Sequence, residues 1–268
     1  NDYMTIIQSI ILGIIEGITE FLPVSSTGHL ILVSDLLGII QTSFIKTFTV
    51  AIQLGAILAV VVLYWKRFLV KKEVWKKVFT AFIPTGIIGF ILYKLVKTFL
   101  LGNEWVVVGS LFVVGIILIV FEIWYGHPSC SANKVKYCSR PNEVLKISYK
   151  QSFLIGVIQS FGMIPGVSRS GATILGGLFM GVERSTIVEF SFLLAIPTML
   201  AATGYDLLRN YQTLDPSQFH LLAIGFVVSF LVAIPSIKFL IGFVQKNNFT
   251  WFGVYRIVVA VIFALIIL

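Results

Sequence analysis

Six apolar stretches, each close to the length of a membrane-crossing helix, constrain the fold of this chain more than any other feature. They cover residues 47–65, 78–101, 105–121, 190–208, 221–241 and 251–268. A helix needs roughly 20 mostly apolar residues to cross the hydrocarbon core of a bilayer. Only 12% of the residues are charged, about half the share of a soluble domain. The sequence therefore predicts an all-α polytopic membrane protein with six transmembrane helices, because outer-membrane barrels instead show short segments of alternating polarity.

The positive charge of the chain is concentrated in two loops. The net charge is +8, and lysines and arginines cluster at 66–77 and 134–150, each time after an apolar stretch. Cytoplasmic loops of membrane proteins carry this excess of Lys and Arg, so we interpret it as a topology signal and expect no nucleic-acid partner. Cys130 and Cys138 lie in the second basic loop without a CxxC spacing. We interpret them as reduced loop cysteines rather than metal ligands.

The chain contains an internal repeat. Residues 8–32 align without a gap with residues 151–175, at a constant offset of 143. The identical pairs are Gln8/Gln151, Ser9/Ser152, Gly13/Gly156, Ile15/Ile158, Val24/Val167, Ser25/Ser168, Gly28/Gly171, Ile31/Ile174 and Leu32/Leu175. Glu16 is aligned with Gln159, a change of acid to amide only. Self-similarity over this length indicates that the fold consists of two similar structural repeats.

The repeat sets the expected topology. The first copy covers 1–125 and the second covers 149–268, with a basic cytoplasmic loop at 126–148 between them. Each copy holds three apolar stretches, and an odd number of crossings makes the second copy enter the membrane from the opposite side. Such inverted repeats are related by a two-fold axis in the membrane plane, and they place a site near the midplane where broken helices converge.

Each copy begins with a segment that is interrupted before it can cross the membrane. Between Asp2 and Glu16 lie 13 uncharged residues, about 20 Å as a helix and too short for ~30 Å of hydrocarbon. Glycines and prolines then break the path, at Gly17, Pro23 and Gly28 in one copy and at Gly162, Pro165, Gly166 and Gly171 in the other. Half-length helices that meet at such breaks predict two re-entrant helix hairpins, at about 4–38 and 150–182.

Glu16 and Glu20 are the first residues that indicate chemistry. They are four apart, so they share one face of a helix among apolar neighbours. A carboxylate inside a membrane is costly and indicates function. Two of them repel each other unless a divalent ion, an arginine or a shared proton lies between them. A pair that is hydrogen-bonded within the bundle is the structural alternative.

Hydroxyl groups and one imidazole follow at the break of the first hairpin. Ser25, Ser26 and Thr27 precede Gly28 and His29. Ser26 or His29 can serve as a nucleophile, and His29 also as a general acid or base. The hydroxyls can instead cap the next helix, and a lone histidine on an apolar helix is ordinarily a core residue. The position of His29, one turn from the hydroxyls and near two carboxylates, favours a function.

The second hairpin carries an anion-binding pattern. Glycine-rich backbone that includes Gly166 leads into a helix, whose N–H groups and dipole attract anions. Arg169 adds a planar fork suited to phosphate oxygens, and Ser168, Ser170 and Thr173 add further donors. An arginine that is neutralised by the acidic pair is the alternative. Acidic and basic halves that face each other predict phosphoryl transfer with a metal ion, because metal, Arg and N–H donors recur in such sites.

Residues 16–29 (EGITEFLPVSSTGH) and 165–173 (PGVSRSGAT) resemble the two signatures of the undecaprenyl-diphosphate phosphatase family of the bacitracin-resistance type. The resemblance extends over essentially the whole chain, including 46–61. The family implies hydrolysis of the lipid undecaprenyl diphosphate to the monophosphate, which recycles the lipid carrier of cell-wall synthesis. It also implies a bacterial plasma-membrane enzyme whose site faces the outer side and which depends on a divalent cation, Mg²⁺ or Ca²⁺.

The residue patterns and the resemblance together give the expected roles of individual residues. The expected catalytic residues are Glu20, Ser26, His29 and Arg169. The expected diphosphate-binding residues are Ser25, Thr27, Gly166, Ser168, Arg169, Ser170 and Thr173. The expected metal ligands are Glu16 and Glu20.

Several alternatives stay open at this point. Ser26 can attack the terminal phosphorus or position a water, and His29 or Glu20 can take the proton. The polyprenyl tail would lie between helices, open to membrane lipids, and the chain can be a monomer or a homodimer. A transporter of the same lipid is the main rival, since inverted repeats with broken helices are typical of transporters. The Ser and His residues beside the carboxylates favour the enzyme, because binding alone does not require them.

Overall fold

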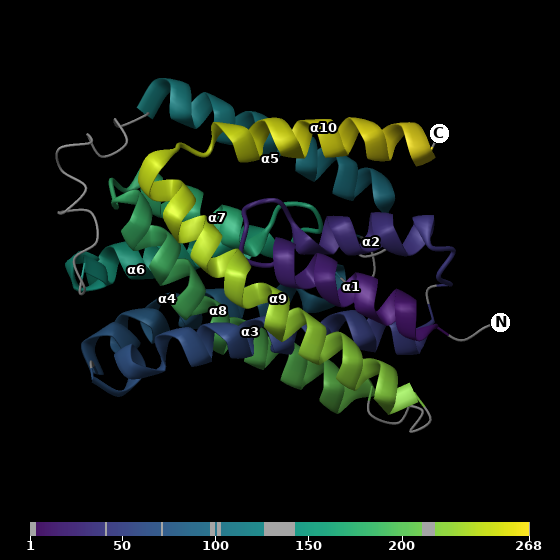
Figure 1. The fold of residues 1–268 in the computed structure, drawn as a ribbon. Coiled ribbons are helices and arrows are strands. Elements are labelled where there is room, and N and C mark those ends of the chain that lie inside the picture. The colour runs from purple at the N-terminus through teal and green to yellow at the C-terminus, as the bar shows by residue number, and fades with distance from the viewer. Residues whose placement is uncertain are drawn as a thin grey trace.

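A computed structural model shows helices as the sole regular secondary structure in the part of the chain that it describes (Figure 1). The described residues are 4–40, 42–70, 72–96, 100, 103–125, 143–210 and 218–267. The first half contains α1 (Ile6–Thr19), α2 (Ser26–Leu36), α3 (Ser43–Val70), α4 (Lys72–Leu95) and α5 (Glu104–Tyr125). The second half contains the 3-10 helix η3 (Glu143–Lys146), α6 (Tyr149–Gln159), the 3-10 helix η4 (Ser160–Met163), α7 (Arg169–Phe179), α8 (Arg184–Asn210), α9 (Phe219–Lys246) and α10 (Thr250–Ile267). Cys130, Cys138 and most of the predicted basic loop at 126–148 lie outside the described residues.

Five of the described helices are long and apolar enough to cross a membrane, by length and composition: α3, α4, α5, α8 and α9. Large apolar side chains such as Phe90, Ile123 and Leu231 stand exposed on these helices, as expected of surfaces that face lipid. The prediction of an all-α polytopic membrane protein is confirmed at this level. The sixth predicted span, at 251–268, falls on α10, which is apolar but shorter than the five.

Two helix–break–helix hairpins, α1–α2 and α6–α7, begin the two halves of the structure. Each starts with a capping box, in which Thr5 or Ser148 accepts a hydrogen bond from the backbone N–H of Gln8 or Gln151. The glutamine side chain accepts in return from the backbone N–H of the capping residue, which satisfies donors that a helix start leaves free. The same glutamines donate to the carbonyl groups that end α2 and α7, both at 3.2 Å. One local sequence pattern therefore ties the two arms of each hairpin together.

The tips of the two hairpins meet near the centre of the molecule. In Figure 1, α1 and α6 start at opposite ends and run toward each other. α1 packs along α9 and α6 along α4, so each hairpin is held by a helix of the other half. The approach is close at Gly13 and Gly156, where an added Cβ would lie 2.8 Å from the carbonyl oxygen of Gly225 and 1.9 Å from that of Ala81. Glycine at these two equivalent positions therefore permits the packing.

α5 and α10 pack against each other along one side of the molecule (Figure 1). Their contact is close at Gly115 and Gly253, where an added Cβ would lie 2.9 Å or 2.7 Å from the carbonyl oxygen of the other glycine. α10 reaches the centre of the fold through Arg256, which is fully buried. The shorter helix α10 is thus part of the structure around the hairpin tips.

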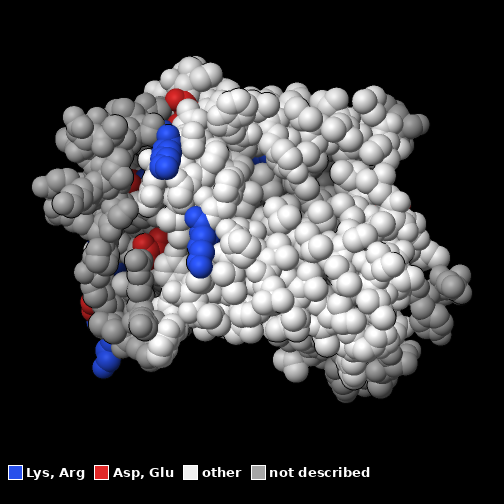
Figure 2. Space-filling model, in the orientation of Figure 1, with Lys and Arg blue, Asp and Glu red and all other residues white. Residues whose placement is uncertain are grey.

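Charged side chains are distributed unevenly over the surface. On the face drawn in Figure 2, lysines and arginines lie mostly at the left end, and uncharged residues cover most of the rest. The corner between α3 and α4 and the connection between α9 and α10 lie at that same end in Figure 1. This bias has the form that a membrane protein with one basic side is expected to show.

Candidate active site

Ser25 and Ser168 give both hairpin tips the same local geometry. They have φ angles of 73° and 78° and are the described non-glycine residues with positive φ. Each is the N-cap of its helix, with a hydroxyl that accepts from the backbone N–H of Gly28 at 3.4 Å or of Gly171 at 3.1 Å. Gly166 adds a φ of 92°, and an added Cβ there would lie 2.6 Å from a backbone oxygen of α5. Strained backbone of this kind persists where surrounding structure holds it, and it is typical of functional sites.

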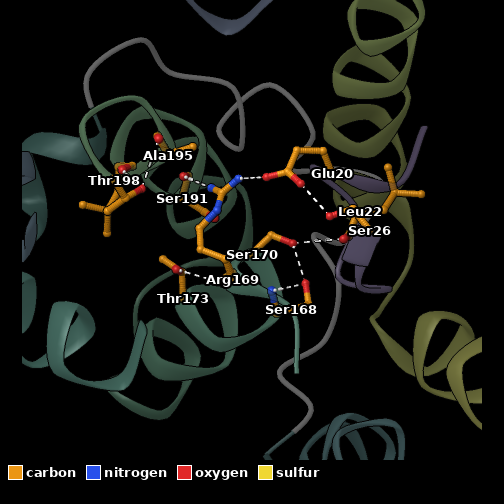
Figure 3. Close-up of polar contacts among 12 residues, drawn as sticks. Glu20, Leu22, Ser26, Ser168, Arg169, Ser170, Thr173, Ser191, Ala195 and Thr198 are labelled. Carbon is orange, nitrogen blue, oxygen red and sulfur yellow. Dashed lines mark hydrogen bonds and ion pairs between the residues drawn. The ribbon is translucent and has the colours of Figure 1, made fainter. Parts of the chain in front are cut away.

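Glu20 lies where the two tips meet and binds a side chain from each (Figure 3). Ser26, the first residue of α2, donates from Oγ to Glu20 Oε2 at 2.6 Å. Arg169, the first residue of α7, donates from Nη2 to Glu20 Oε1 at 2.7 Å. Glu20 is 6% exposed, so little water competes for these contacts. A carboxylate that accepts a short hydrogen bond from a hydroxyl can take its proton when the oxygen attacks, or hold a water in place.

Arg169 also contacts α8, and one of its nitrogen atoms, Nε, has no acceptor among the described residues. Its Nη1 donates to the carbonyl oxygen of Ser191 at 3.1 Å, as Figure 3 shows. Its Nε is buried and finds no acceptor among the described residues. A buried guanidinium N–H without an acceptor is costly, and phosphate oxygens match the fork geometry of arginine. Arg169 is therefore placed to bind an anion beside Glu20.

The other hydroxyls of the second tip join it to the first. Ser168 and Ser170 are 3.0 Å apart at their Oγ atoms, and Ser170 Oγ donates to the carbonyl oxygen of Leu22 at 2.9 Å (Figure 3). These two predicted phosphate-binding side chains thus make contacts within the protein. Thr27, which is also predicted to bind phosphate, belongs to the first tip and is half-buried on the first turn of α2.

Glu16 and its repeat equivalent Gln159 have opposite hydrogen-bonding environments. Gln159 donates to Thr85 Oγ1 at 3.1 Å and accepts from Thr173 Oγ1 at 3.0 Å, which completes a neutral buried network. Glu16 is also fully buried, but neither of its oxygens receives a hydrogen bond from a described residue. Its carboxyl group lies close enough to Glu20 for the two groups to interact. The acidic half of the site therefore has two open oxygens, and buried polar atoms of this kind call for a ligand or a proton.

The acidic pair is the part of the site that fits a metal ion. In the described ranges, no group of three or more His, Cys, Asp or Glu side chains is placed to hold one. Mg²⁺ is commonly bound by one or two carboxylates together with phosphate oxygens of the substrate. The open oxygens of Glu16 beside Glu20 fit that smaller donor set. The predicted ligands are thus suited to a cation that binds together with a phosphate.

His29 faces α10 rather than Ser26. Its Nδ1 lies 2.8 Å from the carbonyl oxygen of Ser25, and its Nε2 lies 2.7 Å from the hydroxyl of Tyr255. A carbonyl only accepts, so Nδ1 carries the proton and Nε2 accepts from Tyr255 when the ring is neutral. The two rings are also stacked, with centroids 5.5 Å apart. The proton that Ser26 donates in this structure goes to Glu20, not to His29.

The sequence interpretation missed two residues of α10 that reach this region. Tyr255 orients His29, and the buried Arg256 contacts both hairpin tips. Arg256 is the sole charged residue in the sequence of α10. An ionisable residue in an apolar segment indicates function by default, so this signal was available. Tyr255 carried no comparable signal, because an interfacial or packing role explains a tyrosine in such a helix equally well.

The fold and the site together define a polytopic helical membrane protein with a buried cluster of polar side chains at two helix breaks. More particularly, the chain belongs to the family described as bacitracin resistance protein BacA, whose model matches residues 9–262. This confirms the family resemblance of the two motifs.

Curated relatives match the chain over nearly its whole length. It is 50% identical over 261 residues to an undecaprenyl-diphosphatase of Aquifex aeolicus (strain VF5), which covers 97% of this chain and 98% of the relative. It is 52% identical over 265 residues to an undecaprenyl-diphosphatase of Persephonella marina (strain DSM 14350 / EX-H1), covering 99% and 100%. A third protein of that name, from Bdellovibrio bacteriovorus (strain ATCC 15356 / DSM 50701 / NCIMB 9529 / HD100), is 47% identical over 98% of this chain and 97% of its own.

Proposed function

We propose that this protein hydrolyses undecaprenyl diphosphate to undecaprenyl phosphate and inorganic phosphate, and so recycles the lipid carrier of cell-wall synthesis. The contact of Glu20 with both Ser26 and Arg169 is the observation that carries the proposal. On this proposal, the buried cluster joins a nucleophile, its base and a cation that binds phosphate. Family membership and the names of relatives at about half identity support the same reaction.

Arg169 and Glu20 are assigned complementary parts in this reaction. The guanidinium of Arg169 binds oxygens of the diphosphate and stabilises charge that develops at the terminal phosphorus. Ser26 attacks that phosphorus, or orients the water that does, and Glu20 accepts the proton. The bond between the terminal phosphorus and the bridging oxygen breaks, and undecaprenyl phosphate leaves. Where Ser26 is the nucleophile, water then attacks the phosphoserine, the bond between Ser26 Oγ and phosphorus breaks, and the serine oxygen regains a proton. On either route one water is consumed, and it supplies the fourth oxygen of the released phosphate.

Glu16, His29 and a divalent cation complete the proposed site. Glu16 and Glu20 would hold the cation, Mg²⁺ or Ca²⁺, which supplies positive charge that neutralises phosphate oxygens. The open oxygens of Glu16 support this assignment. His29 is oriented by Tyr255 and the Ser25 carbonyl at the base of the first tip. We assign His29 to proton transfer after the attack on phosphorus, because Ser26 already donates its proton to Glu20.

The proposed enzyme is a multi-pass protein of the bacterial plasma membrane with its site open to the outer side. Its two hairpins are re-entrant and belong to inverted repeats, with α3–α5 and α8–α10 as three spans each. The gathering of basic side chains at one end supports a cytoplasmic position for that end. The start of both hairpins at opposite ends of the molecule supports the inverted arrangement.

Phosphate release in detergent tests the proposal directly. Purified protein is mixed with undecaprenyl diphosphate, and inorganic phosphate is measured over time with Mg²⁺ or Ca²⁺ present. We expect multiple turnovers, because the reaction needs no second compartment. Protein that binds the lipid but releases no phosphate under any of these conditions would overturn the enzyme and favour the transporter.

A further inference from the structure

Arg256 is the largest fully buried side chain in the part of the protein that the structure describes. Its side chain lies in the interior with no exposed surface. A guanidinium has five N–H donors, and here five hydrogen bonds are formed, all to backbone carbonyl oxygens. Nε donates to Leu111 at 3.4 Å, Nη1 to Pro23 and Val167 at 3.1 Å each, and Nη2 to Ser110 at 3.4 Å and Gly166 at 2.6 Å.

The acceptors belong to three parts of the fold that are distant in the sequence. Pro23 lies in the tip of the first hairpin, Gly166 and Val167 lie in the tip of the second, and the remaining two acceptors lie on α5. No carboxylate of a described residue forms an ion pair with Arg256. A buried cation without a counter-charge is costly unless dipoles compensate it. The carbonyl groups of the two tips supply those dipoles, so the burial of Arg256 and the position of the tips depend on each other.

We propose that Arg256 is a positioning residue that docks the tips of both hairpins and thereby sets the geometry of the catalytic cluster. Its contacts at Pro23 and Val167 lie one or two residues before Ser25 and Ser168, the strained N-caps of α2 and α7. Ser26 and Arg169 follow at once, so a shift of either tip moves the donors on Glu20. Arg256 does not bind phosphate itself, since all five donors are taken.

The geometry of the guanidinium is essential to this role. Lysine offers three donors from one atom on a flexible stem, so it cannot span Pro23 on one side and Gly166 on the other as the planar fork does. A misplacement of about 1 Å can lower a rate by 10²-fold. Arg256→Lys keeps the charge and loses the fork, whereas Arg256→Gln loses both. The matched control is Arg184→Lys, because Arg184 is also a mostly buried arginine but pairs with Glu122 away from the tips.

The catalytic consequence rests on the proposed function and is measured as turnover per binding site. Phosphate release is divided by the molar capacity for a non-hydrolysable methylene analogue of the polyprenyl diphosphate. We expect Arg256→Lys to lose about 10²-fold in turnover per site while it binds close to one analogue per chain, and Arg184→Lys to stay near wild type. A purely structural role would lower capacity and turnover together. If Arg256→Lys keeps the wild-type turnover per site, the proposal is wrong. This test remains decisive if Arg256→Gln does not fold.

Docking itself has a readout that needs no activity. Backbone amide hydrogen exchange is followed in detergent for the tip segments at 20–26 and 164–170 and for α8 as a reference. We expect faster exchange in both tips of Arg256→Lys and unchanged exchange in α8. Unchanged exchange in both tips overturns the docking role. This result is independent of phosphate release, so a failure of the proposed function and a failure of this inference can be told apart.

Discussion

Ser26 and Arg169 occupy the same position of the two repeats, and each donates to a different oxygen of Glu20. Both are the first residues of their helices, directly after a serine cap with positive φ. Equivalent positions of the two hairpins thus carry a hydroxyl group in Ser26 and a cation in Arg169, and both bind the carboxylate of Glu20. This relationship explains why the site needs both tips, and it makes Glu20 sensitive to changes in either half.

Removal of the Ser26 hydroxyl is expected to abolish most of the activity. Ser26→Ala takes away either the attacking oxygen or the group that orients a water, and the loss of such a transition-state contact costs about 10²–10³-fold in kcat. The matched control is Ser34→Ala on the same helix, because Ser34 is equally buried and its hydroxyl has no partner among the described residues. Phosphate release by the two purified variants decides the role. Near-normal activity of Ser26→Ala would contradict both roles of Ser26 and would mean that water attacks phosphorus without help from this serine.

Arg169→Lys is expected to be a severe change although the charge is kept. Lysine cannot bind Glu20 and the Ser191 carbonyl at once and still offer an N–H to phosphate, as the fork of arginine does. We expect kcat/KM to fall by about 10²-fold. Arg209→Lys, an exposed position, is the control. A phosphate-release series over lipid concentration separates kcat from KM, and a value within threefold of wild type, about 0.7 kcal/mol, would contradict the assigned role.

The sequence predicted the membrane class and the two hairpins because apolar length and Gly/Pro breaks are local signals. The meeting of Glu20, Ser26 and Arg169 was within reach of the repeat argument, since inverted repeats bring their breaks together. The alternative prediction, that Arg169 pairs with an acidic residue, is confirmed by its ion pair with Glu20. The Nε atom of Arg169 finds no acceptor in the described part of the chain, so the ion pair with Glu20 does not exclude phosphate binding.

Other parts of the site could not be predicted, because they depend on side-chain direction and on helices that arrive from elsewhere in the chain. His29 looked like the partner of Ser26 by spacing, but its ring turns toward Tyr255. Thr173 looked like a phosphate ligand, but its hydroxyl completes the network around Gln159. The direction of His29 depends on Tyr255 of α10, which lies outside its hairpin. The direction of Thr173 is set within its own hairpin, by Gln159 at the end of α6.

Tyr255→Phe tests the orientation of His29. The change keeps the ring that stacks on the imidazole and removes only the hydrogen bond to Nε2. A neutral hydrogen bond contributes about 0.5–1.5 kcal/mol, so we expect a fall in kcat of about twofold to tenfold. His29→Ala is expected to lose more, because it also removes the imidazole. If His29→Ala is impaired and Tyr255→Phe is fully active, the hydroxyl of Tyr255 does not orient the ring.

Gln159→Glu is expected to lower stability. The amide nitrogen donates to Thr85, and a carboxylate at that place cannot. A buried group left unsatisfied costs about 1–3 kcal/mol, and more when it is charged. Thermal unfolding in detergent should therefore show a lower Tm for Gln159→Glu, with Gln245→Glu near the C-terminal end of α9 as an amide-to-acid control. An unchanged Tm would mean that the amide network is not what distinguishes Gln159 from Glu16.

Glu16→Gln tests the assignment of the open carboxylate to a cation. Chelation with EDTA should stop phosphate release by the wild type, and added Mg²⁺ or Ca²⁺ should restore it, because the charge on the phosphates is then neutralised again. Glutamine keeps the shape of Glu16 but loses the charge, so the cation concentration for half-maximal activity should rise by about tenfold or more, as expected when a metal ligand set is weakened. Titration of activity against each cation measures this shift directly. A variant with lower activity but an unchanged cation requirement would instead assign Glu16 to a proton shared with Glu20.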